Sequence, residues 1–549
     1  MDSAPGHGKV AHTGCHQTLE IMSKELKASL VRNSLRALGI LTLCTCVSHG
    51  QSLRANVANP DSALQTILHT LQGTSLPLHE AVQSALENAT SVRSAEAVYM
   101  SARGAARREA GSFDPRVYFT FNHVDQATPS ASFFAGAPVL NTKQNTATGG
   151  LRVDLPTGTT IDASLTTVKF ETNSLFANLN PQYTSFTNLS LRQPLLGGFF
   201  VSATKNSVQA DRESEAAKSR YDQEVLATSS QAEQNYWDLY AAERDFAVQK
   251  LTRDRAEAFL KDTETRARTG LIGPNQVANA RTFLAEQEIL LIDREEQLDR
   301  LSDALSSLIG KRPDSGKVRL ITTDDPPEEF PVENLDILVG EAKERNLRLQ
   351  AARSDIEARK ALSKAAFWEA LPKVDFVASL GGNGLAGGAQ DVIFGGDTLR
   401  APFSGTMGEA MRQALKRNYP TWSVGVEVSV PIGLRSGLGE EDRLDAELII
   451  AEQLLIQQAR ALEEEVRTSY RELFNGKRRL QAARAGVDAA GEQVRIGLIE
   501  FQNGRTTAFE LVRLGADFAV AQQRYSQAMV RSAKAATNLR QLTSGAYGK

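Results

Sequence analysis

The chain has 549 residues, enough for several ordinary domains, so the size of the hydrophobic core does not limit the fold. Its 65 acidic and 62 basic residues nearly balance. The formal net charge of -3 argues against a nucleic-acid-binding protein, because phosphate recognition normally needs a basic surface.

Residues 1–50 have the layout of a secretory signal peptide. Arg32 and Arg36 precede an apolar run at residues 37–47, which is too short to span a bilayer, and small residues follow. We expect cleavage near Gly50, with Met22 as an alternative start and a disordered leader as an alternative interpretation. Residues 51–75 are then an N-terminal extension.

All cysteines of the chain lie in this leader, at Cys15, Cys44 and Cys46. The mature chain therefore has neither a disulfide framework nor a thiolate site. Lipidation at Cys44 or Cys46 is the alternative, although the residues before them do not favour it. The chain after the leader has no apolar run of about 18 residues, so a membrane role would have to use strands.

Two long repeats follow, at residues 76–310 and 335–549, joined by a Pro- and Asp-rich linker at 311–334 with one short predicted strand at 318–322. A glycine breaks each helical run, Gly270 in the first and Gly504 in the second, 234 positions apart (504 minus 270). The same spacing relates Val277 to Leu511, Tyr236 to Tyr470 and Leu239 to Leu473, which indicates a duplication.

Each repeat is predicted to contain a helical hairpin built from a very long helix. Residues 201–268 and 438–503 have helical patterns, and at 1.5 Å per residue the first helix would be about 100 Å long. Gly270 and Pro274 predict a hairpin tip at 269–275, since glycine ends a helix and proline opens one. The second tip is expected at 503–507, with Thr506 or Thr507 as the N-cap. The helices alone are also compatible with a generic coiled coil.

Two membrane strands are predicted in each repeat. In residues 421–430 the apolar Trp422, Val424, Val426 and Val428 alternate with polar or small residues, as in a strand with one lipid face and one lumen face. Segments 116–124, 184–193 and 373–380 alternate similarly. Four strands cannot close a barrel, and lipid does not tolerate an open sheet edge, so three copies would have to combine into twelve strands.

Two Gly- and Ser-rich segments, 125–150 and 381–408, are predicted to be long exposed loops. Residues 149–170 indicate an extra hairpin that turns at 156–158 and either caps the barrel or replaces a predicted strand. The segment from Gly382 to Gly387 matches a dinucleotide fingerprint, but no helix pattern follows the glycines, so we expect no nucleotide site. His69, His79 and His123 lack the spacing of metal ligands, and no catalytic signature suggests an enzyme or a cofactor.

The order of these features resembles the TolC-like outer membrane efflux protein family over nearly all of residues 76–543. The most specific marks are "RTGLIGPNQVANAR" and "QNGRTTAFELVR" at the tips, "QPLLGG" and "VPIGL" after strands, and "ALPKVDF" before one. The resemblance implies a mainly α-helical chain with β-strands, assembled as a trimer. Its strands would form one shared outer-membrane β-barrel, and its helices a periplasmic tunnel.

The resemblance also implies partners and site residues. A periplasmic adaptor and an inner-membrane pump would act with the channel, and the adaptor would dock on the hairpin tips at Thr269, Gly270, Leu271, Asn503, Gly504 and Arg505. The periplasmic constriction would be lined by Phe501, Thr506, Glu510 and Arg513. Arg513 could pair with Glu510 one turn away, which departs from a purely acidic, cation-selecting ring.

The function that follows is a passive outer-membrane conduit of a tripartite export system, opened at its periplasmic tip. The alternative is a secreted structural coiled-coil protein that conducts nothing. The cargo is left open by the sequence.

Overall fold

The computed structural model describes residues 62–313, 319–331, 334–394, 396–503 and 505–547. The predicted leader with its cysteines and residues 51–61 lie outside this range. The helices are α2 (Ser62–His69), α3 (Leu78–Asn88), α4 (Thr90–Ala110), α5 (Val201–Arg268), α6 (Pro274–Ile309), α7 (Leu335–Arg345), α8 (Leu347–Ala370), α9 (Met407–Lys416), α10 (Arg435–Gln502) and α11 (Ala508–Leu542).

The described chain divides into two compact units. One contains residues 62–71 and 247–287, and the other contains residues 72–246 and 288–547. The first unit therefore holds α2 and the end of the first helical hairpin, whereas the second holds the sheet, the second hairpin and the linker.

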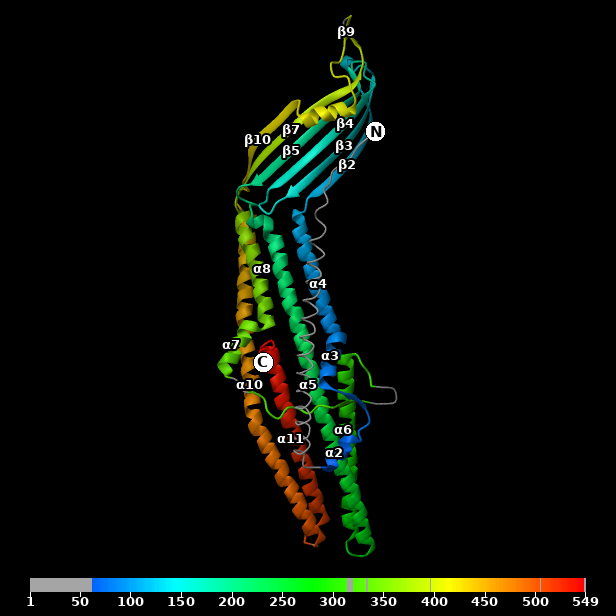
Figure 1. The fold of residues 1–549 in the computed structure, drawn as a ribbon, viewed down its shortest axis with the longest axis vertical. Helices are drawn as coiled ribbons and strands as arrows, with labels where there is room; N and C mark the ends of the chain where they lie inside the picture. The colour runs from blue at the N-terminus through cyan, green and yellow to red at the C-terminus, as the bar shows by residue number, and fades with distance from the viewer. Residues whose placement is uncertain (1–61, 314–318, 332–333, 395, 504, 548–549) are drawn as a thin grey trace, which may run out of the picture. The chain divides into compact units, whose positions relative to one another are not determined.

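The second unit contains a six-stranded antiparallel sheet in the order β10-β7-β5-β4-β3-β2 (Figure 1). Its strands are β2 (Arg116–Pro129), β3 (Val139–Asp154), β4 (Thr160–Thr172), β5 (Leu179–Pro194), β7 (Lys373–Ala389) and β10 (Tyr419–Ser429). Because β5 pairs with β7 from Gln182 to Pro194, one continuous sheet joins the two repeats. A small hairpin of β8 (Val392–Phe394) and β9 (Asp397–Leu399) forms a separate sheet.

The sequence-based strand count of four was wrong. The first repeat contributes four strands to this sheet, because most of the loop predicted at 125–150 belongs to β2 and β3. The predicted hairpin at 149–170 is real: it joins β3 to β4, and the Gly158 N–H donates to Leu155 O at 2.8 Å in the turn. It adds to the predicted strands and replaces none. The strands of this hairpin are rich in Thr and small residues, so their sequences lack the apolar alternation that identifies β10.

The prediction of a loop at 381–408 was also wrong in part. The glycine-rich stretch that resembles a dinucleotide fingerprint continues β7 to Ala389, and it pairs with β5 up to Gly387. The helix α9 covers this part of the strand. The glycines therefore allow close packing of a helix on a sheet, which sequence spacing alone does not distinguish from a flexible loop.

The predicted long helices are confirmed. The helix α5 spans Val201–Arg268 as expected, α6 begins at Pro274, and α10 begins three residues before the predicted start. In the second unit, α7, α8, α10 and α11 share a core that includes Leu338, Val466 and Leu539. The duplicated positions Leu239 and Leu473 are both buried.

Ion pairs hold α5 to α11 within the second unit. Lys534 contacts Asp238 at 2.8 Å and Arg540 contacts Glu233 at 2.9 Å, while Gln234 donates to Asn538 at 2.8 Å. The two repeats are therefore packed side by side along these helices, as their duplication suggests.

The linker contains the predicted short strand, seen as β6 (Leu320–Thr322), which pairs in parallel with β1 (Thr74–Leu76). The helix α5 holds this strand through buried side chains. Glu243 accepts hydrogen bonds from the Thr322 N–H at 2.8 Å and from the Thr322 hydroxyl at 2.6 Å. One and two turns before it on the same helix, Tyr240 donates to Asp325 at 2.8 Å and Tyr236 donates to Asp324 at 3.1 Å.

Candidate functional site

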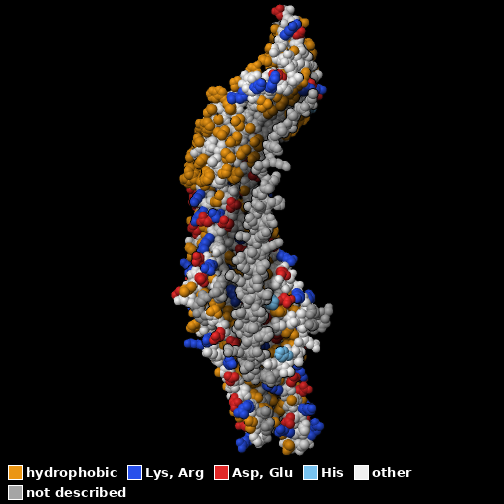
Figure 2. Space-filling view, in the orientation of Figure 1, with side chains coloured by type: hydrophobic (Ala, Val, Ile, Leu, Met, Phe, Trp, Pro, Cys, Tyr) orange, Lys and Arg blue, Asp and Glu red, His pale blue; other side chains and the backbone are white. Residues whose placement is uncertain are grey.

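One face of the sheet is apolar and exposed. The register places Trp422 opposite Leu380, Val424 opposite Ala378 and Val426 opposite Phe376, so all these side chains lie on one face. The exposed fraction is 71% for Trp422 and 62% for Val426. Figure 2 shows this face as a continuous hydrophobic area over the sheet. A soluble protein rarely exposes such an area, so it indicates contact with another apolar phase or surface.

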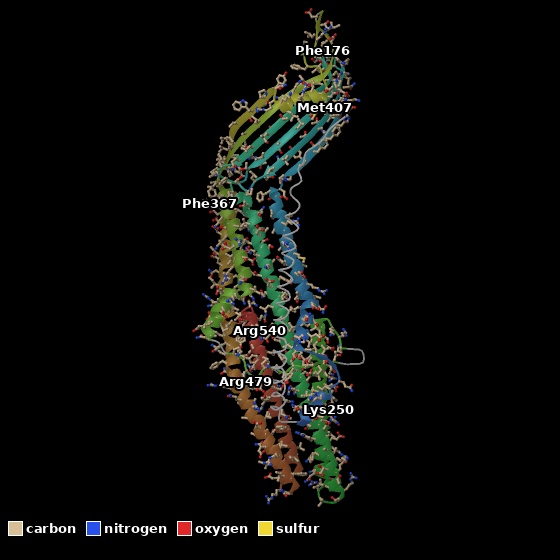
Figure 3. All side chains as sticks on the ribbon, viewed as in Figure 1. Phe176, Lys250, Phe367, Met407, Arg479 and Arg540 are labelled. Carbon is tan, nitrogen blue, oxygen red and sulfur yellow. The ribbon has the colours of Figure 1, made fainter. Side chains whose placement is uncertain are left out.

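Aromatic residues mark the end of this area near the helices. Phe199, Phe200 and Phe367 are half-exposed there, and Phe367 lies where α8 approaches the sheet (Figure 3). From Trp422 to Val430 the chain advances eight residues, about 26 Å along a strand, or about 20 Å along the normal at a tilt of about 40°. This height is comparable to the apolar band of about 25 Å that surrounds outer-membrane proteins.

The opposite face of the sheet is polar and carries a row of ion pairs at the ends of the strands next to the helices. Arg152 contacts Asp162 at 3.3 Å, and Arg192 contacts both Asp375 and Glu427, the latter at 3.7 Å. Arg152, Asp162 and Arg192 line a hollow of about 430 Å³. This row was not predicted from the sequence, although charged residues alternate with apolar ones in "LRVDLP", "TIDAS" and "KVDF".

The first hairpin tip lies in the first unit and ends α5 with a glycine cap. The Gly270 φ is +74°, its N–H donates to Ala267 O at 3.0 Å, and the Leu271 N–H donates to Arg266 O at 3.0 Å. This pair of bonds is the Schellman arrangement, which needs a residue in the left-handed region. The Leu271 side chain is 74% exposed. The tip therefore presents an apolar side chain on a fixed backbone.

The second hairpin tip lies in the second unit and repeats this hydrogen bond. The Arg505 N–H donates to Glu500 O at 2.8 Å, and both residues lie 234 positions after Leu271 and Arg266. Asn503 bonds its own helix through its side chain, which donates to Ile499 O at 2.8 Å. The predicted docking residue Gly504 lies outside the described residues.

The residues expected at the constriction follow this turn. Thr507 is the N-cap of α11 and accepts from the Glu510 N–H at 3.3 Å, as one of the two predicted alternatives. The structure brings Glu510 and Arg513 together at 2.6 Å. Phe501 lies at the end of α10 and Thr506 in the turn, and both side chains are half-buried.

Burial strongly raises the pKa of one acid that holds the linker, Glu243. Glu243 is 5% exposed, and burial raises the pKa of its carboxyl from 4.5 to about 7, against the opposing effect of the hydrogen bonds from Thr322 and the charge of Arg244. Burial also raises the pKa of Tyr236 and Tyr240 above their ordinary value. All three side chains hydrogen-bond to linker residues in the range 322–325, in or directly after β6.

Within the described ranges, no helix combines the length and the apolarity needed to cross a bilayer. Among those residues, no group of three or more His, Cys, Asp or Glu side chains could hold a metal ion. Of the histidines considered in the sequence, His123 contacts Asn145 across β2 and β3 at 2.5 Å.

Comparison with known proteins gives one family match. The model of a family described as "Outer membrane efflux protein" matches residues 81–311 and 338–545, which are the two repeats without the linker. No curated protein matches the chain.

Several solved structures share the fold. The outer-membrane channel OprN is 17% identical, covers 85% of this chain and 90% of its own, and has a TM-score of 0.61. VceC from Vibrio cholerae is 15% identical, with 86% and 97% covered and a TM-score of 0.59. MtrE from Neisseria gonorrhoeae, solved in an open state, is 14% identical, with 85% and 89% covered and a TM-score of 0.58.

Proposed function

Because the chain belongs to the outer membrane efflux protein family, we propose that it is the outer-membrane channel of a tripartite export system, a passive conduit that three copies form together. The observation that carries the proposal is the six-stranded sheet with one exposed apolar face and two unpaired long edges, β2 and β10. The same apolar face argues against the alternative of a secreted coiled-coil protein.

Closure of the sheet follows from the chemistry of a membrane. Lipid offers no hydrogen-bond partner for the free N–H and C=O groups of an edge strand, so an open sheet is not stable there. The strand β10 of one copy and β2 of the next would pair in antiparallel fashion, since the two edge strands run in opposite directions. Three copies of six strands would supply 18, an even number within the range of such barrels.

The two faces of the sheet suit the two environments of such a barrel. The valine-rich face of β10 would contact lipid, and the face with Arg152, Arg192 and Glu427 would line the aqueous lumen. The row of ion pairs would then lie near the point where the barrel meets the helical part.

The hairpin tips are proposed as the docking surface for a periplasmic adaptor that links the channel to a pump. At the first tip the exposed Leu271 on a glycine-capped turn would supply an apolar contact, with Thr269 and Gly270 beside it. At the second, Asn503, Gly504 and Arg505 would have the same role. Rigid turns favour docking because less conformational entropy is lost on binding.

Opening of the channel is proposed to occur at the second tip, where Phe501, Thr506, Glu510 and Arg513 would form the constriction. The pair of Glu510 with Arg513 neutralises the carboxylate, so this ring would select cations weakly.

Cross-linking at the edges of the sheet tests the assembly. A double variant, Thr120→Cys in β2 and Ser423→Cys in β10, treated with a short bis-maleimide, is expected to give covalent dimers and trimers. The control Thr166→Cys in β4 with Ser423→Cys places one thiol in the middle of the sheet, about 14 Å from β10 at about 4.8 Å per strand, and should stay monomeric. Equal cross-linking of both variants, or none in either, would contradict closure between copies.

A further inference from the structure

We propose that α9 is a membrane-interface helix that binds the phosphate groups of membrane lipids through Arg412 and Lys416. The inference rests on the proposed function, because it takes the apolar face of the sheet as the face in contact with lipid. It concerns a surface on the outside of the sheet, away from the tips and the lumen.

The helix α9 lies on the apolar face of the sheet. Gly382 and Gly384 share the face of Leu380 in β7, and a β-carbon placed at Gly384 would lie 1.9 Å from the Ala410 carbonyl oxygen. At Gly382 it would lie 2.4 Å from the Ala414 carbonyl oxygen. The helix therefore sits on the apolar face with its backbone against β7, at two positions where that strand has no side chain (Figure 1).

The position of α9 is fixed by hydrogen bonds as well as by packing. The Thr187 hydroxyl donates to Ala414 O at 3.1 Å, and Gln413 accepts from the Leu385 N–H at 3.0 Å. Ala410 and Ala414 are fully buried. The sheet thus presents α9 rigidly to the medium outside it.

The exposed surface of α9 is divided into an apolar edge and a polar edge. At 100° per residue, Met407, Met411 and Leu415 lie along one edge, and Leu415 is 63% exposed. Glu409, Gln413, Arg412 and Lys416 lie on the other side; Figure 3 labels Met407 at the start of the helix.

The polar edge points away from the apolar band. Gln413 reaches Leu385, and Glu409 lies against Gly405, which bonds Gly387, so these contacts are all with the part of β7 beyond Gly384. The apolar edge then faces the valines of β10. A helix with this division lies in the plane of a membrane interface, with its cations toward the head groups.

The sheet itself becomes polar at the level of α9. The next row of side chains on this face lies two residues beyond Gly384 along β7. In that row Lys169 of β4 is opposite Asn145 of β3, which is opposite His123 of β2. Trp422 of β10 lies on the same face, opposite Leu380, and indole rings are enriched at the interfaces of membrane proteins. Figure 2 shows basic side chains at this limit of the hydrophobic area.

The charge of α9 identifies the partner as anionic. Arg412 pairs with Glu409, but Lys416 forms no ion pair with any residue that the structure describes, and the exposed Arg417 adds a further cation. The segment 407–417 thus has three cations and one carboxylate. The phosphate of a lipid with a net negative charge provides the complementary charge at the depth where the helix lies. A neutral head group does not, nor does a zwitterionic one, in which a cation balances the phosphate.

The test titrates the detergent-purified full mature chain with a bisphosphorylated glycolipid and with its dephosphorylated form, and counts bound lipid by native mass spectrometry. The variant Arg412→Gln with Lys416→Gln removes both proposed contacts. Each cation near an anionic surface contributes about fivefold, so we expect the double variant to bind about 25-fold more weakly. The matched control is Lys218→Gln with Arg345→Gln, two exposed cations on α5 and α7.

A third variant separates binding from a merely structural role. Glu409→Gln frees Arg412 from its partner, so affinity for the phosphorylated lipid should rise by up to about fivefold. Equal binding of phosphorylated and dephosphorylated lipid, or equal loss in the control, would overturn the proposal. A change of oligomeric state in the double variant, with lipid selectivity kept, would assign α9 to a contact between copies and overturn it too.

These outcomes are distinct from failure of the proposed function. A wild-type chain that stays monomeric without a detergent micelle would contradict the channel itself. A detergent-embedded trimer without phosphate selectivity would contradict the role of α9 alone.

Discussion

Because Glu243 is buried, we predict that the linker strand β6 opens more readily as the pH rises. Burial raises the pKa of its carboxyl from 4.5 to about 7 in the folded protein, and one pKa unit corresponds to 1.36 kcal/mol. The protonated form is therefore favoured in the folded state by about 3 kcal/mol. This stabilisation is complete below about pH 4.5 and is lost as the pH rises through about 7.

The variant Glu243→Gln removes this titration and keeps an oxygen that can accept from the Thr322 N–H. At pH 5 we expect little change. At pH 8.5 we expect the variant to hold β6 more firmly than the wild type by up to about 3 kcal/mol, since a buried amide carries no charge.

Hydrogen exchange of residues 320–324, measured by mass spectrometry and corrected for the intrinsic rate, reports the opening of β6. The wild type should lose protection by up to about a hundredfold between pH 5 and pH 8.5, and Glu243→Gln should not. The control Asp238→Asn lies on the same helix in a half-exposed ion pair, and it should follow the wild type. The same loss of protection in Glu243→Gln as in the wild type would refute the reasoning.

Further predictions concern the tips and the sheet. Gly270→Val forces a β-branched residue to φ +74° and should cost about 1–2 kcal/mol, seen as faster proteolysis at the first tip; a cleavage rate equal to that of wild type would contradict the cap. Arg513→Gln leaves Glu510 without its cation and should shift the reversal potential of a planar-bilayer current toward cation selectivity, whereas an unchanged potential would remove the pair from the pore. Val426→Arg on the apolar face should destabilise the folded oligomer by about 2–4 kcal/mol, seen as dissociation at a lower temperature in detergent. Ser423→Arg on the polar face should leave this temperature unchanged. Gly384→Val should displace α9 and lower stability by about 1–3 kcal/mol, while Gly425→Val in β10 meets nothing closer than 3.5 Å and serves as its control.

The helical half of the fold could be predicted from the sequence because its signals are local. Gly270 followed by Pro274 marks the end of one helix and the start of the next, and the repeat of this pattern 234 positions later gives the second hairpin. The ion pair of Glu510 with Arg513 follows from their helical spacing alone.

The sheet could be predicted only where one strand has strongly different faces. The alternation around Val426 identifies β10. In contrast, β3 and β4 are rich in Thr, and β3 also contains Gly149 and Gly150; these residue types suit both lipid and water and give no period. The glycines of β7 were misassigned for a different reason. Gly384 is required by the contact with Ala410, and a helix that packs from 26 residues away leaves no trace in local spacing.

We propose above all that copies of this chain close their sheets into one channel. Single-particle electron microscopy of the detergent-purified mature protein tests it most directly. We expect a threefold particle whose detergent belt encloses a closed ring of 18 strands, continuous with a hollow helical part. A solid helical rod without a detergent belt, or a particle whose sheets remain open at β2 and β10, would contradict it.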